Sequence, residues 1–346
     1  MSASENHVVV MTIRPLYVGF IVFHACTHAT VLGIIAPRWG AAGRVACCAS
    51  LLLAWSVSSA SDYATCCALR DLVREPAASK ALSSGDKALA AGDAAEALQR
   101  YKDIAASKDR VLASSAFERL GEAYAEGTGV KQDFTRSVQE FQTAALLGDP
   151  YAEANLADFL FFGVGTPADP KQALNWALKA GTAGIAPAMS RLGWQYLNGL
   201  GTTADAEQAR QWYRKGADKG DLTSQYQLAW IYEHVDPNDY QKAMRWYKEA
   251  ATTHDSKGAQ RPEEAKAQNN IGDMLEQGLG VAVDYESAAR WYAIAARSGY
   301  VRALYHLGNL YAEGLGVSRD LPLARTLMQR AAEKGDGDAT EWLATH

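Results

Sequence analysis

Apolar and small residues recur along most of this chain in blocks with helical spacing, separated by turns rich in glycine. One block places Ala303, Leu307, Gly308 and Tyr311 on one side of a helix. Its leading apolar residue recurs every 36 residues, apart from one spacing of 43. These leading residues are Leu120, Leu156, Leu192, Leu228, Ile271, Leu307 and Leu343. A fixed period of this length is typical of a tandem structural repeat.

Each block predicts two helices joined by a short loop. A Gly-x-Gly sequence follows the first helix, and glycine readily adopts the left-handed geometry that ends a helix. An aspartate then precedes the second helix, where its carboxylate can accept hydrogen bonds from free backbone amides. These aspartates are Asp133, Asp169, Asp205, Asp284 and Asp320. The second helix carries one apolar side, as with Trp212 and Tyr213, and ends at another glycine.

A glycine within the first helix, at 121, 193, 272 or 308, weakens that helix by about 1 kcal/mol relative to alanine. We therefore expect a neighbouring helix to approach closely there. A single pair of helices cannot bury its apolar side, whereas stacked pairs bury it against one another. The pattern thus predicts an all-α, elongated superhelix with contacts between neighbours only.

The glycine pairs also suggest a nucleotide site, because glycine-rich loops wrap phosphates. Five pairs dispersed at one phase of a repeat cannot form one such site, however. A dinucleotide-binding sequence also needs a preceding strand and a third glycine, and neither is present. We therefore interpret the pairs as structural.

The repeated pattern A-x-x-x-L-G-x-x-Y-x-x-G-x-G-V-x-x-D-x-x-x-A-x-x-W-Y-x-x-A-A-x-x-G resembles the Sel-1-like repeat, a relative of the tetratricopeptide repeat. The resemblance covers residues 116–346. It implies a right-handed α/α superhelix (solenoid) of about six to seven helix-turn-helix repeats that works as an adaptor without catalysis. Bacterial relatives serve in the envelope, in exopolysaccharide or secretion assemblies, or in host contact. One branch of the family ties each unit with a disulfide, whereas this chain has no Cys after Cys67.

We expect three parts: a signal peptide or membrane-anchor segment at 1–60, a linker at 61–79 and the solenoid at 80–346. The solenoid begins with a shorter lead unit, in which "DAAE" at 93–96 is a helix-capping sequence. The units are 80–112, then repeats from about 113, 149, 185, 221, 264 and 300, and a half unit at 336–346. The fourth repeat lacks the glycine pair and precedes an insertion at 252–265, which predicts a partner-contacting loop or a joint between two rigid halves.

Residues 1–60 hold two apolar runs, at 16–36 and 45–60. The second follows Arg38 and Arg44 and ends in Ser58-x-Ala60, the layout of a signal peptide. The first run is long enough to span a bilayer, so both runs are alternatively membrane helices. Because arginines favour the cytoplasmic side, either interpretation places the repeats outside the cytoplasm. The alternative is that this segment is not translated and the repeats are cytoplasmic.

The five cysteines all lie in or near this segment, at 26, 47, 48, 66 and 67. Lipid attachment at Cys66 lacks the usual leucine-like residue three places earlier. Adjacent cysteines rarely bridge each other, so an intermolecular disulfide is the expected oxidised form of the pair at 66 and 67.

The formal net charge is −5, and residues 1–60 carry +2, which leaves −7 for the remaining chain. An acidic solenoid is a poor partner for nucleic acid, which proteins bind through Lys and Arg. We expect a basic or neutral protein or peptide partner, with membrane contact only through residues 1–60.

The sequence predicts no catalytic, cofactor-binding or metal site. "HACTH" at 24–28 has zinc-ligand types but lacks a fourth ligand. The histidines at 234, 254 and 306 lie in different repeats, and His306 is expected to be a surface or packing residue. The acidic series Glu118, Glu122 and Glu126 is expected to be a solvated helix side.

By resemblance to tetratricopeptide-like stacks, the residues two before and two, five and six after each leading residue face an inner groove. We call these positions the inner face. They are, unit by unit, Glu118, Glu122, Ala125 and Glu126; Ala154, Asp158, Phe161 and Phe162; Ser190, Trp194, Leu197 and Asn198; Tyr226, Trp230, Glu233 and His234; Asn269, Asp273, Glu276 and Gln277; and Tyr305, Asn309, Ala312 and Glu313.

The aromatic residues of the inner face are the predicted binding residues: Phe161, Phe162, Trp194, Tyr226, Trp230 and Tyr305. Aromatic side chains are enriched where peptides or sugars are bound. We expect a scaffold that binds a partner peptide or protein with basic residues in the groove. The alternatives are packing of these rings against neighbouring helices, a polysaccharide-export or glycan-binding factor with sugars stacked on Trp194 and Trp230, and an enzyme with its active site in the groove.

Overall fold

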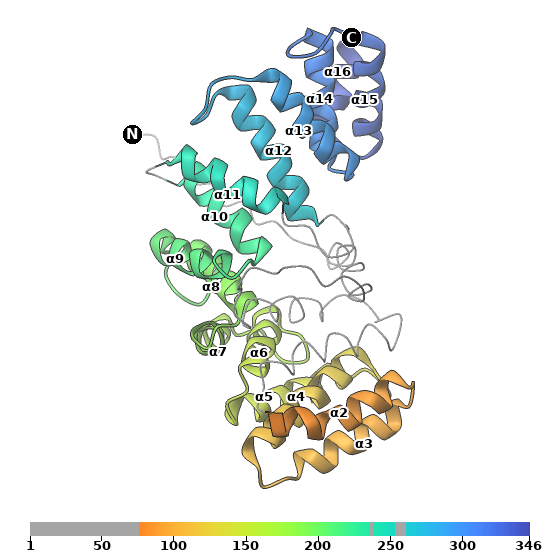
Figure 1. The fold of residues 1–346 in the computed structure, drawn as a ribbon, viewed down its shortest axis with the longest axis vertical. Helices are drawn as coiled ribbons and strands as arrows, with labels where there is room; N and C mark the ends of the chain where they lie inside the picture. Colours follow the sequence, from red (N-terminus) through yellow and green to blue (C-terminus); the bar gives the residue numbers. More distant parts are fainter. Residues whose placement is uncertain (1–75, 236–237, 253–260) are drawn as a thin grey trace, which may run out of the picture.

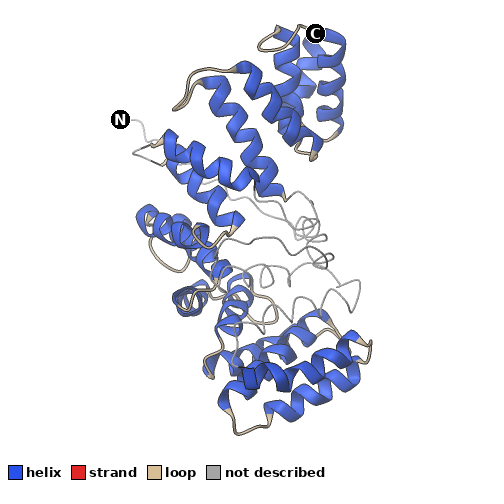
Figure 2. Ribbon diagram, in the orientation of Figure 1, coloured by secondary structure: helices blue, strands red, loops and turns tan. Residues whose placement is uncertain are grey.

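The computed structural model of this protein describes residues 76–235, 238–252 and 261–346. These residues form fifteen α-helices, α2 to α16, and no strand among them (Figure 2). The predicted signal or anchor segment, the five cysteines and most of the insertion after the fourth repeat lie outside the described residues. The predicted all-α class is confirmed.

The helices alternate between first and second members of successive units. The lead unit consists of α2 (Pro76–Ala90) and α3 (Ala94–Ala105). The first helices of the following six units are α4 (Arg110–Glu126), α6 (Pro150–Phe162), α8 (Ala186–Asn198), α10 (Leu222–His234), α12 (Pro262–Gln277) and α14 (Val301–Glu313). The second helices are α5 (Phe134–Leu146), α7 (Pro170–Thr182), α9 (Ala206–Ala217), α11 (Tyr240–Thr252), α13 (Tyr285–Arg297) and α15 (Leu321–Glu333). The last helix is α16 (Gly337–Thr345).

The helices stack in chain order into an arc (Figure 1). Every helix pair with an extensive contact is one or two positions apart along the chain. Contacts between neighbours alone define a solenoid, so the predicted α/α superhelix is confirmed. In Figure 1, the first helices α6 and α8 lie toward the inner side of the arc, and the second helices α7 and α9 lie toward its outer side.

The predicted aspartate caps are all present. Asp133, Asp169, Asp205, Asp284 and Asp320 each accept a hydrogen bond from the backbone amide three residues later, and Asp93 does the same in the lead unit. In the fourth unit, which lacks the glycine pair, Asp239 caps α11 through the amide of Lys242. Hydrogen bonds from the amide and side chain of Gln172 lower the pKa of Asp169 below its usual value. Each second helix therefore has a defined start.

The two glycines of each pair have different roles. The first ends the helix in the left-handed conformation, as Gly199 does with φ of 67° and a hydrogen bond from its amide to the carbonyl of Gln195. The second meets the preceding unit, because a Cβ on Gly201 would lie 2.2 Å from the carbonyl oxygen of Pro170. The equivalent glycines at 129, 165, 280 and 316 also lie against the start of the preceding second helix. The pair therefore joins one unit to the previous one.

The glycine inside the first helix lies beneath a large side chain of its own unit. A Cβ on Gly193 would lie 2.6 Å from the ring of Tyr213. The same arrangement joins Gly85 to Tyr101, Gly121 to Phe141, Gly272 to Tyr292 and Gly308 to Met328. In the second unit, Ala157 stands at the glycine position and Ala177 at the ring position, and both are buried. The expected close approach of a neighbouring helix is confirmed.

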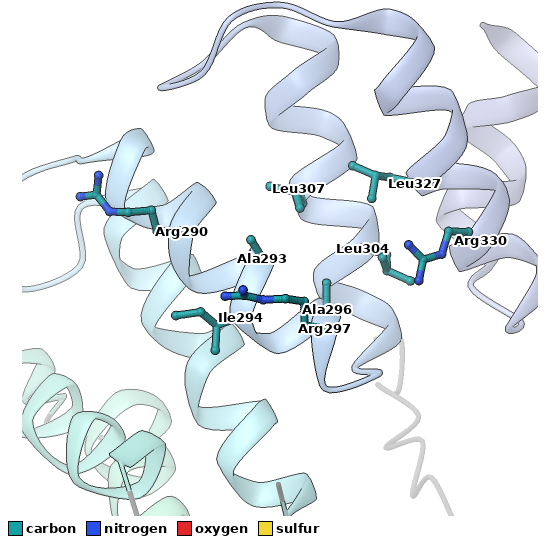
Figure 3. Close-up of a pocket in the computed structure, with 9 residues that line it drawn as sticks. All are labelled: Arg290, Ala293, Ile294, Ala296, Arg297, Leu304, Leu307, Leu327 and Arg330. Atoms are coloured by element: carbon teal, nitrogen blue, oxygen red, sulfur yellow. The ribbon is translucent and has the colours of Figure 1, made fainter. Parts of the chain in front are cut away.

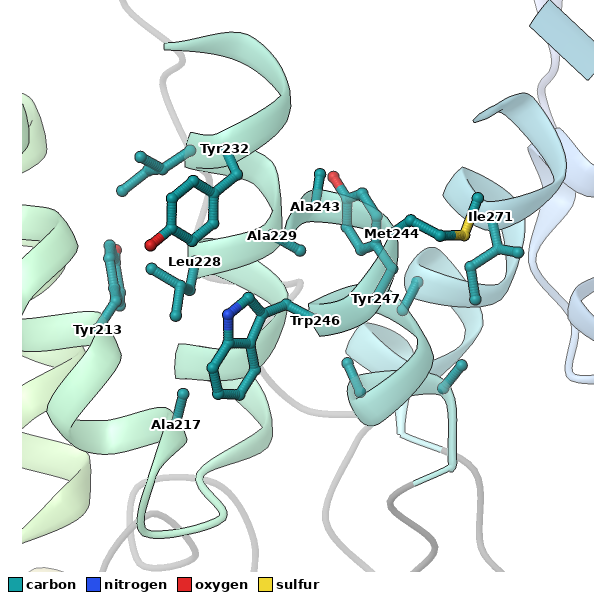
Figure 4. Close-up of a cluster of buried hydrophobic side chains, with 14 of the residues drawn as sticks. Tyr213, Ala217, Leu228, Ala229, Tyr232, Ala243, Met244, Trp246, Tyr247 and Ile271 are labelled. Carbon is teal, nitrogen blue, oxygen red and sulfur yellow. The ribbon is translucent and has the colours of Figure 1, made fainter. Parts of the chain in front are cut away.

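Aromatic side chains fill the space between consecutive units. Figure 4 shows Tyr213 from α9, Trp246 and Tyr247 from α11 and Ile271 from α12 around Leu228 and Ala229 of α10. All of these residues belong to one buried cluster that extends over three units. The core is thus continuous along the stack, and each unit completes the core of the next.

We predict that Gly201→Ala destabilises the chain more than Gly220→Ala. Both glycines have φ of +81°, so both substitutions carry the left-handed strain of about 1–2 kcal/mol. Gly220 has no atom near its added Cβ within 4 Å, whereas Gly201 faces the backbone of Pro170. Overpacking there adds about 1–3 kcal/mol. Urea unfolding followed by far-ultraviolet circular dichroism measures the difference, and equal unfolding midpoints would refute the role of Gly201 in joining units.

We also predict that Gly193→Ala lowers stability by about 1–3 kcal/mol, although alanine normally strengthens a helix, because its methyl group overlaps the Tyr213 ring. Gly337→Ala in α16 is the control, since no atom lies within 4 Å of its added Cβ. We expect that control to be neutral or slightly stabilising. A stabilised Gly193→Ala variant in the same urea titration would contradict the close approach.

Candidate functional site

The six predicted binding residues lie on the first helices and differ in exposure. Phe162 is the most accessible, with 54% of its surface exposed. The other five are partly buried: Phe161, Trp194, Tyr226, Trp230 and Tyr305. They pack in part against the buried clusters of their units. The inner-face aromatics therefore combine a packing role with a partly accessible surface.

The structure brings Phe161, Phe162 and Trp194 together around the guanidinium of Arg191. The ring centroids of Phe161 and Trp194 are 5.1 Å apart, and those of Phe161 and Phe162 are 5.2 Å apart. The Arg191 guanidinium lies 4.7 Å from the centroid of Phe162 and 5.2 Å from that of Phe161. Its Nε donates to Asp158 Oδ1 at 2.7 Å. This aromatic–guanidinium cluster lies between α6 and α8.

The rings of the fourth unit have partners of their own. Trp230 stacks on His234 with centroids 4.8 Å apart and 14° between the planes. The ring centroids of Tyr226 and Tyr247 are 5.8 Å apart. Burial raises the pKa of Tyr226 to about 12. The Tyr247 hydroxyl donates to Glu233 Oε2 at 2.6 Å, and burial raises the pKa of that carboxyl above its usual value. Trp194, Tyr226 and Trp230 all pack against one core cluster.

Tyr305 lies farther along, in α14, and belongs to the core cluster of the last units. The guanidinium of Arg302 lies 4.6 Å from its ring centroid, and His306 contacts the ring edge. The predicted residues thus form the aromatic–guanidinium cluster, the fourth-unit rings and Tyr305, each with its own polar partners.

Charged bridges between successive units run along the same side and were not predicted from the sequence. Each joins a carboxylate on one first helix to a basic residue 33 positions later, which stands just before the next leading residue. The three bridges are Asp86–Arg119 at 3.5 Å, Asp158–Arg191 at 2.7 Å and Asp273–His306 at 3.6 Å. A tyrosine of the intervening second helix hydrogen-bonds the carboxylate in two of them, namely Tyr101 to Asp86 and Tyr292 to Asp273. The recurrence of an acidic and a basic residue 33 positions apart is the sequence signal from which these bridges could have been predicted.

The acidic series in the first repeat is not the solvated surface that the sequence suggests. Glu118 and Glu122 are buried, with 0% and 2% exposure. Arg119 lies 3.7 Å from Glu122 and is itself buried. Burial of a carboxylate is unfavourable without a charged or hydrogen-bonding partner. Arg119 supplies one for Glu122 and also pairs with Asp86 of the lead unit, so this buried ionic group lies where the lead unit meets the first repeat.

The fifth unit contains the densest group of titratable side chains. Asp273, Glu276 and His306 present ligand-type atoms within 4.8 Å of one another, and all three are half-buried. The Tyr292 hydroxyl lies 2.6 Å from Asp273 Oδ1 and 2.6 Å from Glu276 Oε2. The His306 ring stacks on the Tyr292 ring with centroids 4.9 Å apart and 11° between the planes. Burial, followed by the charge of Asp273, raises the pKa of Tyr292, so the phenol remains protonated.

A separate pocket of about 490 Å³ lies between α13, α14 and α15 (Figure 3). Six of its lining residues are apolar and three are arginines. The lining residues are Arg290, Ala293, Ile294, Ala296, Arg297, Leu304, Leu307, Leu327 and Arg330. None of the inner-face residues lines this pocket.

None of the helices within residues 76–235, 238–252 and 261–346 has the length and apolar character needed to cross a membrane.

The chain resembles known proteins over short stretches. It is 41% identical over 70 residues to protein sel-1 homolog 2 of Mus musculus, which is 20% of this chain and 10% of that protein. It is 29% identical over 176 residues to chitin synthase regulatory factor 3 of Schizosaccharomyces pombe, which is 51% of this chain and 14% of that protein. The chain therefore spans only a small part of the length of these curated relatives.

Two solved structures share the fold. A Sel1 repeat protein from Oxalobacter formigenes superposes with a TM-score of 0.59 and 23% identity, covering 72% of this chain and 96% of that one. A protective antigen of uropathogenic Escherichia coli strains with an SLR fold superposes with a TM-score of 0.62 and 27% identity, covering 76% of this chain and 58% of that one.

The family model of the Sel1 repeat matches six consecutive stretches of the chain. They are residues 116–149, 150–185, 186–221, 222–252, 265–300 and 301–336. These matches cover more than half of the sequence, and they agree with the helical stack and with the two solved structures. The chain belongs to the Sel1-repeat family.

Proposed function

We propose that this protein is a non-enzymatic adaptor whose inner face binds a segment of another protein carrying basic residues. Proteins built from Sel1 repeats generally mediate protein–protein interactions, and such scaffolds are typically non-catalytic. The family does not specify the binding surface or the charge of the partner, so we argue the inner face and a basic partner from the residues of this chain.

The aromatic–guanidinium cluster is the observation that carries the proposal. There the chain holds the guanidinium of its own Arg191 against three aromatic rings and one carboxylate. Arginine is held in this way by cation–π contact together with a charged hydrogen bond. Phe162 leaves more than half of its surface open beside this guanidinium, so a partner can extend the same packing.

The charge of the inner face supports a basic partner. Of its twenty-four positions, eight are Asp or Glu and none is Lys or Arg; Glu118 and Glu122 are buried, which leaves six acidic positions that are at least partly exposed. Glu313 is exposed, and Asp158 and Glu233 are half-buried. A negatively charged surface attracts a positively charged partner and repels negatively charged ones.

A glycan partner is less well supported, because sugars stack on open ring faces. His234 is already stacked on Trp230. The Trp194 ring meets the Phe161 ring edge to face and has the Arg191 guanidinium 5.8 Å from its centroid. Both tryptophans thus have intramolecular ring partners.

We further propose that the repeats act outside the cytoplasm. The support is the sequence of residues 1–60 alone, with its apolar runs, the arginines at 38 and 44, and the small residues at 58 and 60. This segment lies outside the described residues.

We predict that Phe162→Ala in the full chain weakens partner binding at least about tenfold, the effect of losing about 1.4 kcal/mol at a binding residue. The exposed ring contributes little to the core, so the fold should persist. Leu146→Ala is the matched control, because Leu146 is an exposed apolar residue of a second helix, with 64% exposure. Partners are captured from an extract of the source organism and identified by mass spectrometry, and binding of the identified segment is then titrated.

The titration is repeated at increasing ionic strength, because salt shortens the Debye length, which is about 10 Å at 0.1 M, and screens the attraction between exposed charges farther apart than that. We expect binding to weaken with salt and the captured segment to be rich in Lys and Arg. Equal loss in the Phe162 and Leu146 variants, or capture of an acidic segment, would refute the proposed surface. Binding of an oligosaccharide in place of a protein would favour the glycan alternative.

If the second apolar run is a cleaved signal peptide, we predict that the native protein begins at the residue after Ala60, as N-terminal sequencing would show. Fractionation of cells should then place the chain outside the cytoplasm. A native chain that begins at Met1 and remains in the cytoplasmic fraction would contradict export.

A further inference from the structure

The group formed by Asp273, Glu276, His306 and Tyr292 contains more hydrogen-bond acceptors than protons. The Tyr292 oxygen lies 2.6 Å from an oxygen of each carboxylate, yet a phenol has one proton to donate. Tyr292 itself is fully buried. If both carboxylates are ionised, one of the two short contacts brings oxygen lone pairs together. An additional positive charge at the carboxylates relieves this repulsion.

The other bridges along the stack show what usually supplies that charge. Asp86 is held by Tyr101 and Arg119, and Asp158 is held by Arg191. The fifth unit has two carboxylates where those units have one, and His306 stands where they have arginine. In the part of the chain that the structure describes, neither Asp273 nor Glu276 has an ion pair with Lys or Arg. Two negative charges thus face one histidine.

The positions of the three side chains suit a metal ion. A metal ion uses only one of the two ring nitrogens of His306, and Nε2 lies 3.6 Å from Asp273 Oδ1. With one ligand atom taken from each of Asp273, Glu276 and His306, the three atoms lie within 4.8 Å of one another. Ligand atoms at about 2.0–2.2 Å from a tetrahedral zinc ion lie about 3.3–3.6 Å from one another. Small side-chain rotations bring these atoms to that spacing. Carboxylate and imidazole ligands together favour zinc over magnesium or calcium, which prefer oxygen ligands alone.

A buried amide next to the carboxylates is a second, independent observation. Asn269, with 3% exposure, donates from Nδ2 to Asp273 Oδ2 at 2.9 Å. Its own Oδ1 is buried without a hydrogen-bond partner within the described ranges. The amide thus holds Asp273 Oδ2 by a hydrogen bond, and a half-turn that presents its oxygen to the group is favourable only when a cation lies between that oxygen and the carboxylate. Tyr292 and Asn269 therefore surround the carboxylates as orienting groups of the kind that metal sites use.

We propose that Asp273, Glu276 and His306 bind a zinc-class divalent cation that links the fifth unit to the sixth. Two ligands come from α12 and one from α14, so the bound ion joins successive first helices. The Tyr292 hydroxyl donates a hydrogen bond to one carboxylate and positions it. The proposal does not depend on the identity of the protein partner.

The test is a titration of the full chain with Zn²⁺ by isothermal calorimetry, with Co²⁺ as a spectroscopic probe. The variants His306→Gln and Asp273→Asn remove one ligand each and keep the side-chain size. We expect each to weaken one binding step at least tenfold. Cysteine ligands elsewhere in the chain give a sulfur-to-cobalt charge-transfer band, and these variants should leave that band unchanged.

His234→Gln is the matched control, because His234 also stacks on an aromatic ring and lies 3.5 Å from Glu233, but it faces a single carboxylate. We expect it to bind zinc as the wild type does. Far-ultraviolet circular dichroism of each variant verifies that the helices persist. Identical zinc titrations for the wild type and His306→Gln would overturn the proposal and leave a shared proton between the carboxylates. Equal weakening in His234→Gln would also overturn it.

Discussion

The close approach of backbone to backbone at the second glycine of each Gly-x-Gly pair is the constraint on which the other features depend. Any side chain at Gly201 would collide with the carbonyl of Pro170, and the other glycine pairs repeat this contact with the preceding unit. The contact fixes how far one unit is displaced from the previous one. In the units with a glycine pair, an aspartate cap then starts the second helix at a constant distance from the leading residue, so that these units present the same positions to the next.

Because the displacement is constant, two positions on successive first helices meet at each junction. One is the position of Asp158, and the other is the position of Arg191, just before the next leading residue. The chain uses this junction differently in different units, with arginine at Arg119 and Arg191 and histidine at His306. The aromatic–guanidinium cluster and the proposed cation site are two outcomes of one geometry. In our proposals, the first presents an exposed ring to a partner, and the second links two successive units through a bound cation. On these proposals, one regular scaffold carries separate functions at different junctions.

The period, the helices and their caps were predictable, because hydrophobic spacing and capping residues are local signals. The close packing at Gly193 was also predictable, because glycine destabilises a helix and is usually kept inside one where a neighbouring side chain leaves no room for a Cβ. The contact of Gly201 with Pro170 and the bridge from Asp158 to Arg191 were not predicted, because periodicity shows which side a residue faces but not which residue of the next unit it meets. Burial of Glu118 and Glu122 was missed for the same reason.

Amide hydrogen exchange under native conditions, compared between the wild type and Gly201→Ala, tests most directly whether units depend only on their neighbours. If the stack is held by successive contacts, exchange becomes faster in α7, α8 and α9, which surround the altered junction, and stays unchanged in α13 to α15. Equal acceleration in all of these helices would show that distant units support one another directly, and it would contradict the account of the fold given above.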